Sequence, residues 1–92
     1  MTTFLMFGKF SAEGMKGISA ARTVEAQKII KQNGGEMISA YVLLGDHDVL
    51  LIVNFPSIDD VLKSSMALSK LMGISISTVP AVTAEHFDKM IA

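Results

Sequence analysis

Residues 36–55, EMISAYVLLGDHDVLLIVNF, contain two apolar runs that are separated by a short Gly-Asp-His segment at residues 45–47. Val, Ile, Tyr and Phe favour extended strands, and a short loop that contains Gly and Asp is typical of a β-hairpin. This stretch therefore predicts two antiparallel strands, over residues 36–44 and 48–55.

The segments on either side of the hairpin add two helices and two further strands. Apolar residues recur near helical spacing over residues 11–33 and 58–72, and Gly follows each segment closely. The remaining runs predict a first strand over residues 3–10, a last strand over residues 74–82 and a short terminal helix over residues 84–91. The order β-α-β-β-α-β predicts an α+β, ferredoxin-like fold with a C-terminal short helix.

Three single residues refine this prediction. Ser57 and Thr83 stand immediately before predicted helices, where a side-chain oxygen can accept from the free N–H groups of the first turn. Pro80 has no backbone N–H, so the last strand is expected at an edge of the sheet or at a bulge.

The composition fits one folded domain over residues 1–92. Hydrophobic residues make up 50% of the chain and charged residues 18%, which supplies a core and lacks the signature of disorder. The net charge of -1 comes with no basic cluster, so nucleic acid is not an expected partner. The absence of Cys excludes disulfides, thiolate metal sites and thiol nucleophiles. No run reaches the roughly 20 apolar residues of a spanning helix, and we expect a cytoplasmic protein without membrane contacts.

The first strand is apolar on both of its faces. Side chains alternate across a strand, so Phe4, Met6 and Phe10 point one way and Leu5 and Phe7 the other. Two helices on one side of the sheet leave the second apolar face open. A large exposed apolar face usually marks an interaction surface, and we expect a homodimer in which two sheets pack face to face.

Four segments together resemble a known family: FLMFGKFSAEGMKGI, the Arg22 of the first long helix, GGEMISAYVLLGDHDVLLIVNFPS and TVPAVTAEHF. In this order and spacing they are similar to the GYD domain family of small bacterial proteins. The resemblance implies the fold of the dimeric α+β barrel superfamily, in agreement with the two apolar faces of the sheet. In the Gly-Tyr-Asp motif that names the family, Gly45 and Asp48 are retained here, whereas His47 replaces the Tyr.

Arg22, Tyr41, His47 and Asp48 are the candidate ligand-binding residues. Arg22 presents a planar fork that suits a carboxylate. It is expected either to pair with Asp48, and so to fix the strand register, or to bind an anion. Tyr41 and His47 are expected either to form a polar lip on a barrel cavity or, for Tyr41, to pack in the core or at an interface.

Two clusters contain residue types that bind metals, namely 46–48 (Asp-His-Asp) and the pair His86 and Asp88. Consecutive turn residues diverge, and Asp is common in turns for local reasons, so the first cluster is interpreted as a hairpin turn. The second is interpreted as a solvated helix face. No metal or cofactor is therefore expected. Five methionines are assigned to core and dimer packing: Met6, Met15, Met37, Met66 and Met72.

These observations favour a homo-oligomeric module that binds a small molecule, or serves assembly, with a pocket between sheet and helices or at the dimer interface. The alternative is a cofactor-independent, monooxygenase-like enzyme of the dimeric α+β barrel type, with His47 in proton transfer. A third interpretation is purely structural, with Met and Phe side chains filling the barrel. No nucleophilic triad or phosphate-binding glycine loop is present in the sequence.

Overall fold

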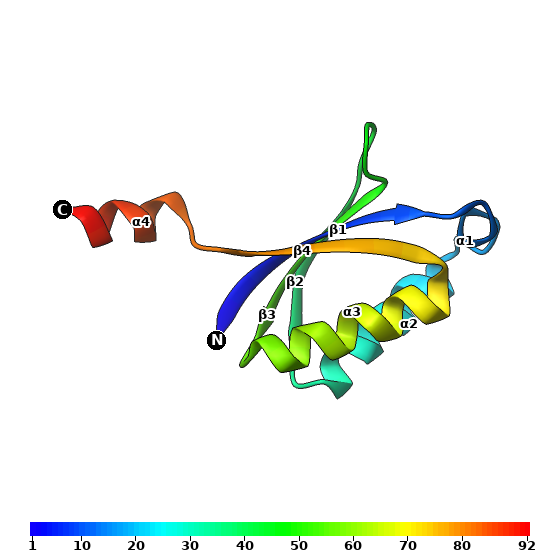
Figure 1. The fold of residues 1–92 in the computed structure, drawn as a ribbon, viewed down its shortest axis with the longest axis horizontal. Helices are drawn as coiled ribbons and strands as arrows, with labels where there is room; N and C mark the ends of the chain where they lie inside the picture. Colours follow the sequence, from blue (N-terminus) through cyan, green and yellow to red (C-terminus); the bar gives the residue numbers. More distant parts are fainter.

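The chain forms four strands and four helices, and the computed structural model describes all of residues 1–92. The four strands pair into one antiparallel sheet in the order β2-β3-β1-β4, and α2 and α3 lie together on one face of it (Figure 1). This is the predicted β-α-β-β-α-β arrangement with a terminal helix. The bounds of the elements are β1 Thr2–Phe10, α1 Ala12–Lys16, α2 Ala20–Gln32, β2 Glu36–Val42, β3 Val49–Phe55, α3 Ile58–Met72, β4 Ile74–Ala81 and α4 Ala84–Ile91.

The prediction of one long helix over residues 11–33 is wrong, because this segment contains two helices. α1 is a short helix with Ser11 at its N-cap and Gly17 at its C-cap. α2 starts afresh after Ser19, whose hydroxyl accepts from the backbone N–H of Arg22 at 3.3 Å. Gly has low helix propensity, and Ser competes as an N-cap, so the chain breaks where these residues meet.

The second half of the chain follows its predicted boundaries closely. α3 and α4 cover the predicted residues, and the side chains of Ser57 and Thr83 cap them by accepting from Asp60 and His86. β4 is an edge strand, and its Pro80 therefore has no ladder partner on the outer side. The hairpin strands are shorter than expected, since β2 ends at Val42 and β3 begins at Val49.

The two faces of the sheet differ as the alternation in β1 predicts. Phe4 and Met6 are buried under the helices, whereas Leu5 and Phe7 on the open face are only half-buried. β3 continues the same division, because Leu5 lies opposite Ile52 and Phe7 opposite Leu50. The buried core between sheet and helices consists of Phe4, Met6, Ala26, Ile30, Val53, Phe55, Val61, Leu68, Met72 and Ile74.

The short helix α1 packs closely against the C-terminal end of α3. The backbone N–H of Ser11 donates to the carbonyl of Gly73 at 2.8 Å. Gly73 has a left-handed conformation, φ +60°, which favours Gly at a helix C-terminus. A Cβ on Gly14 would lie 2.5 Å from the carbonyl oxygens of both Met72 and Gly73, so this position accepts only Gly without movement of the backbone.

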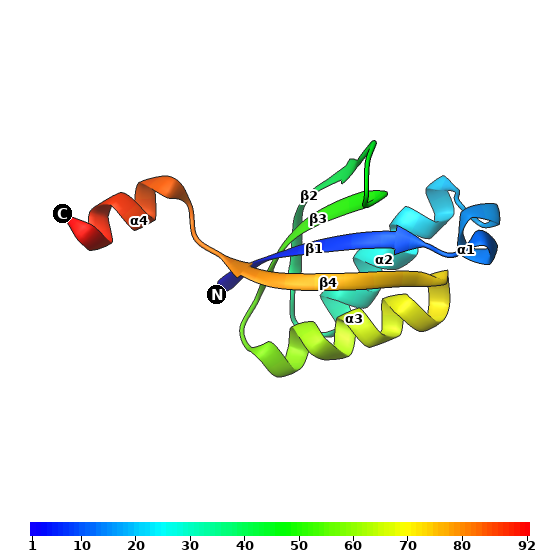
Figure 2. The same cartoon turned by 45° about the horizontal axis from the view of Figure 1, so that its top comes forward.

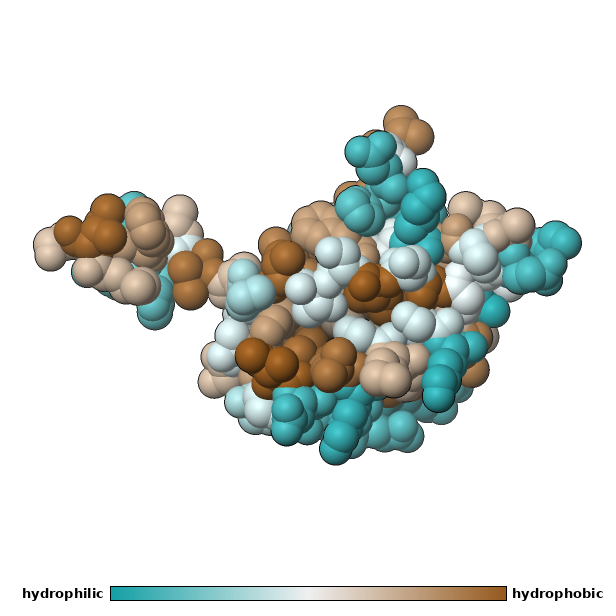
Figure 3. Space-filling view, viewed as in Figure 1, coloured by the Kyte–Doolittle hydropathy of each residue, from teal (hydrophilic) through white to brown (hydrophobic).

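α4 stands apart from the rest of the domain. It follows the end of β4 after two residues and extends beyond the sheet, on the side away from α3 (Figures 1 and 2). Its apolar residues are exposed, and Figure 3 shows hydrophobic surface on this isolated helix. They are Phe87, Met90 and Ile91. None of the four helices has the length and hydrophobicity that a transmembrane span requires.

Replacing Gly14 by Ala tests the close approach. Ala is favoured over Gly in a helix by about 1 kcal/mol, but the added methyl group would meet two backbone carbonyls. We expect the clash to prevail and to lower the free energy of unfolding by about 2 kcal/mol, measured by urea denaturation. Glu13→Ala, at an exposed position of α1, is the control and should stay within about 0.5 kcal/mol of wild type. A Gly14→Ala protein as stable as wild type would contradict this packing.

Candidate functional site

A pocket of about 520 Å³ lies between α2 and the sheet. It is open to solvent on one side and is lined by residues from all four strands and from α1, α2 and α3. Fifteen of its 19 lining residues are hydrophobic, and the four others are Ser19, Arg22, Thr23 and Asp48. A largely apolar hollow with a few polar groups is the usual form of a small-molecule site, and this volume is within the ordinary range.

Three small side chains, those of Thr23, Ala26 and Ala40, leave space on the pocket side of α2 and β2. α2 contributes Arg22, Thr23 and Ala26 to the lining, and β2 contributes Met37, Ala40, Tyr41 and Val42. The large core residues Phe4 and Phe55 are not part of the lining.

Arg22 lies on the inner face of α2, toward the core. It stands four residues before the buried Ala26 and eight before the buried Ile30, so all three share one face. Its Nη1 donates to the carbonyl of Gly14 at 3.1 Å and to the carbonyl of Met72 at 3.0 Å. Met72 ends α3, so the guanidinium satisfies one of the free carbonyls at that C-terminus.

The predicted ion pair between Arg22 and Asp48 is wrong. The three ion pairs of the structure are exposed pairs within single helices, and neither residue takes part in them. Asp48 Oδ2 instead accepts from the backbone N–H of Phe10 at 2.9 Å, and its own backbone N–H donates to Gly8 at 2.7 Å. Asp48 thus joins the hairpin to β1, and both charged groups line the same pocket with backbone partners.

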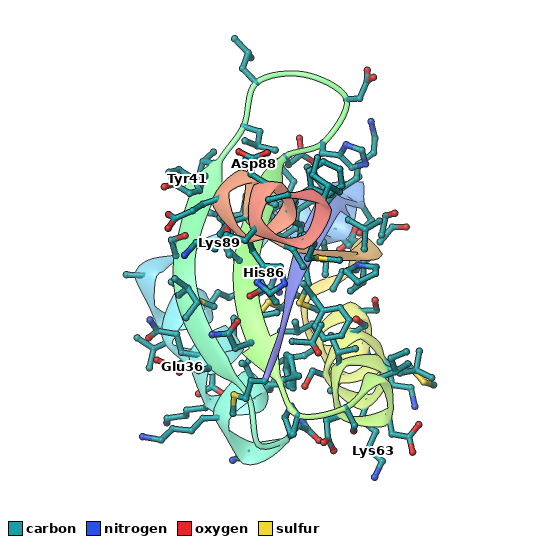
Figure 4. All side chains as sticks on the ribbon, turned by 90° about the vertical axis from the view of Figure 1, so that its left-hand side faces the viewer. Glu36, Tyr41, Lys63, His86, Asp88 and Lys89 are labelled. Atoms are coloured by element: carbon teal, nitrogen blue, oxygen red, sulfur yellow. The ribbon has the colours of Figure 1, made fainter.

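Tyr41 contributes to the pocket wall, whereas His47 does not. Tyr41 is 55% exposed and lies opposite Leu50, which is on the open face, so its side chain points to that face and it borders the pocket only at the free edge formed by β2 (Figure 4). The His47 ring packs against Phe7, with 5.3 Å between ring centroids, and Phe7 belongs to the open face of the sheet. Of the four candidate residues, the structure therefore brings Arg22, Tyr41 and Asp48 to one pocket and places His47 elsewhere.

The candidate metal ligands His86 and Asp88 and the methionines lie in different parts of the structure. His86 and Asp88 are carried by α4, which stands in front of the sheet in Figure 4. No three His, Asp or Glu side chains converge as a metal site would require. The methionines divide between two roles: Met6 and Met72 belong to the core, while Met15, Met37 and Met72 line the pocket. Met37 also packs against the core, in agreement with its predicted packing role, whereas Met15 and Met66 are largely exposed.

The GYD domain family model matches residues 4–91. The chain belongs to the GYD domain family. No curated protein sequence matches this GYD domain significantly.

Three solved structures share the fold of this GYD domain. The structure of FFRP-DM1 is 21% identical with a TM-score of 0.60, covering 89% of this chain and all of the other. The hypothetical protein PHS023 from Pyrococcus horikoshii is 19% identical with a TM-score of 0.56, covering 94% and 95%. The leucine response regulatory protein LrpA of Mycobacterium tuberculosis is 8% identical with a TM-score of 0.59, and 90% of this chain spans 51% of it. These similarities establish the ferredoxin-like fold.

Sequence reasoning missed the residues that the helix break brings to the pocket. Met15, Ile18, Ser19 and Thr23 line it because α1 ends at Lys16 and α2 starts at Ala20. The signal was present as a second N-cap: Ser19 follows Gly17 and precedes a good helical segment.

Replacing Asp48 tests its role at the base of the hairpin. Asp48→Ala leaves the part-buried N–H of Phe10 without its acceptor, and we expect a loss of about 1 to 2 kcal/mol in the free energy of unfolding. Asp48→Asn retains an acceptor oxygen and should lose less. His47→Ala removes one ring contact and should also lose less than Asp48→Ala. Urea denaturation of the three variants decides, and equal losses for Asp48→Ala and His47→Ala would contradict the assignment.

Proposed function

We propose that this GYD domain is a homo-oligomeric module that binds a small, mainly apolar molecule in the pocket between α2 and the sheet. The observation that carries the proposal is the pocket itself: about 520 Å³, with 15 hydrophobic residues among 19 and two charged groups, Arg22 and Asp48. A hollow of this kind in a small core costs packing energy, which a bound apolar molecule would recover.

Assembly is the second part of the proposal, and the open face of the sheet supports it. Leu5, Phe7, Leu50 and Ile52 form a half-buried apolar surface that no helix covers. The apolar residues of α4 are exposed as well, and an isolated helix of eight residues is marginal in water. A second copy of the chain, seated on the open face by a twofold axis, would cover the first surface and offer α4 a partner.

Uptake of the neutral dye Nile red, measured by fluorescence titration, tests the binding function. Ala40 lines the pocket and is exposed, so Ala40→Trp would fill the mouth with little strain on the core. We expect wild type to bind the dye and Ala40→Trp to bind it at least 10-fold more weakly. Lys63→Trp, on the outer side of α3 (Figure 4), is the matched control and should behave as wild type. Failure of wild type to bind, or equal binding by Ala40→Trp, would contradict a pocket site.

A charge on the open face tests the assembly. Ile52 points away from the helices, since its neighbours Leu51 and Val53 pack with the core. We expect Ile52→Glu to dissociate the oligomer, because burial of an unpaired carboxylate between two sheets is strongly unfavourable. Light scattering after size-exclusion chromatography gives the mass, with Lys63→Glu as the control. A wild-type monomer, or an Ile52→Glu protein of unchanged mass, would refute assembly through this face.

A further inference from the structure

The cation of the pocket has no anion beside it. Arg22 takes part in no ion pair. The only hydrogen bonds of its side chain go to the neutral backbone carbonyls of Gly14 and Met72. Both of those bonds use Nη1. A guanidinium has five N–H donors, so the donors on Nε and Nη2 remain without a protein acceptor.

The guanidinium is also held in place. Its two carbonyl partners come from two different helices, α1 and α3, while Arg22 itself belongs to α2. Nη2 lies close over Gly17, because a Cβ built on that residue would be only 2.5 Å from it. An arginine that is fixed before binding loses little side-chain entropy when it meets an anion.

The surroundings favour an anion with an apolar body. Hydrophobic side chains make up most of the lining, and the first turn of α2 contains no acidic residue. An oxyanion at this place would meet the planar donors of Arg22 in an environment of low polarity, where charge-assisted hydrogen bonds are strong. The second charged group of the lining, Asp48, disfavours a further negative charge on the same molecule.

We propose that the pocket selects an apolar monocarboxylate, with its carboxylate on the free donors of Arg22 and its hydrocarbon part among the hydrophobic residues of α2 and the sheet. This inference rests on the proposed binding function and names the chemical class of the ligand. The fixed guanidinium and the apolar lining support it. The lack of an acidic residue in the first turn of α2 agrees with it but would not suggest it alone.

Isothermal titration calorimetry with octanoate and octanamide tests the inference. The two compounds have the same chain, and they differ in whether the head group is charged. We expect wild type to bind octanoate at least 10-fold more tightly than octanamide in 50 mM salt, with a smaller ratio at 500 mM because salt screens the charge. Equal affinities for the two compounds, or a preference for octanamide, would overturn the assignment of a carboxylate.

The variant Arg22→Gln tests whether the preference for octanoate depends on Arg22. It removes the charge, and the octanoate-to-octanamide affinity ratio should fall to about 1. Lys28→Gln removes the same charge from an exposed position of α2 and should keep the wild-type ratio. A ratio that survives in Arg22→Gln would overturn the role of Arg22. Because Arg22 also joins three helices, folding of the Arg22→Gln variant is checked by circular dichroism. If this variant does not fold, the octanoate-to-octanamide affinity ratio of wild type decides whether the carboxylate assignment stands.

The failure of this inference is distinguishable from the failure of the binding function. If wild type takes up Nile red in the pocket but does not prefer octanoate to octanamide, the carboxylate class is wrong and the binding site stands. If wild type takes up neither Nile red nor octanoate, the binding function itself is wrong.

Discussion

The bridge made by Arg22 is the interaction on which the arrangement of the helices depends. One guanidinium nitrogen bonds the carbonyl of Gly14 in α1 and the carbonyl of Met72 at the end of α3, while its own backbone belongs to α2. The bridge is possible because Gly14 and Gly73 let two backbones approach without side chains between them. The same guanidinium lines the pocket, so the bridge between the three helices also forms part of the pocket wall.

The two faces of the sheet have different surroundings. The inner face holds the core and the pocket, and the outer face presents Leu5, Phe7, Leu50 and Ile52. Asp48 contributes to both the sheet and the pocket: its side chain and its backbone bond to β1, and it lines the pocket. His47 packs on Phe7 instead, so a ring of the hairpin belongs to the outer surface.

The sequence predicted the element order, the two apolar faces of β1 and the full extents of α3 and α4, because local patterns with clear caps decide them. The candidate site was predicted only in part. Arg22, Tyr41 and Asp48 do line one pocket, but the partners of Arg22 are backbone carbonyls 8 and 50 residues away. No side-chain pattern encodes a bond to a distant carbonyl. The helix break after Gly17 did have a local signal, because Gly17 is a weak helix former and Ser19 is a good N-cap, and the prediction of one long helix overlooked it.

The methionines of the pocket bear on how finely it can discriminate. Met15, Met37 and Met72 stand in the wall, and each has an unbranched side chain with several rotatable bonds and a polarisable sulfur. Such a wall reshapes around its occupant at little energetic cost, whereas branched side chains in a rigid wall would reject a misfit. For the ligand site that we propose, such a wall would make selection depend on polarity and charge, and molecules of different shape would fit the pocket.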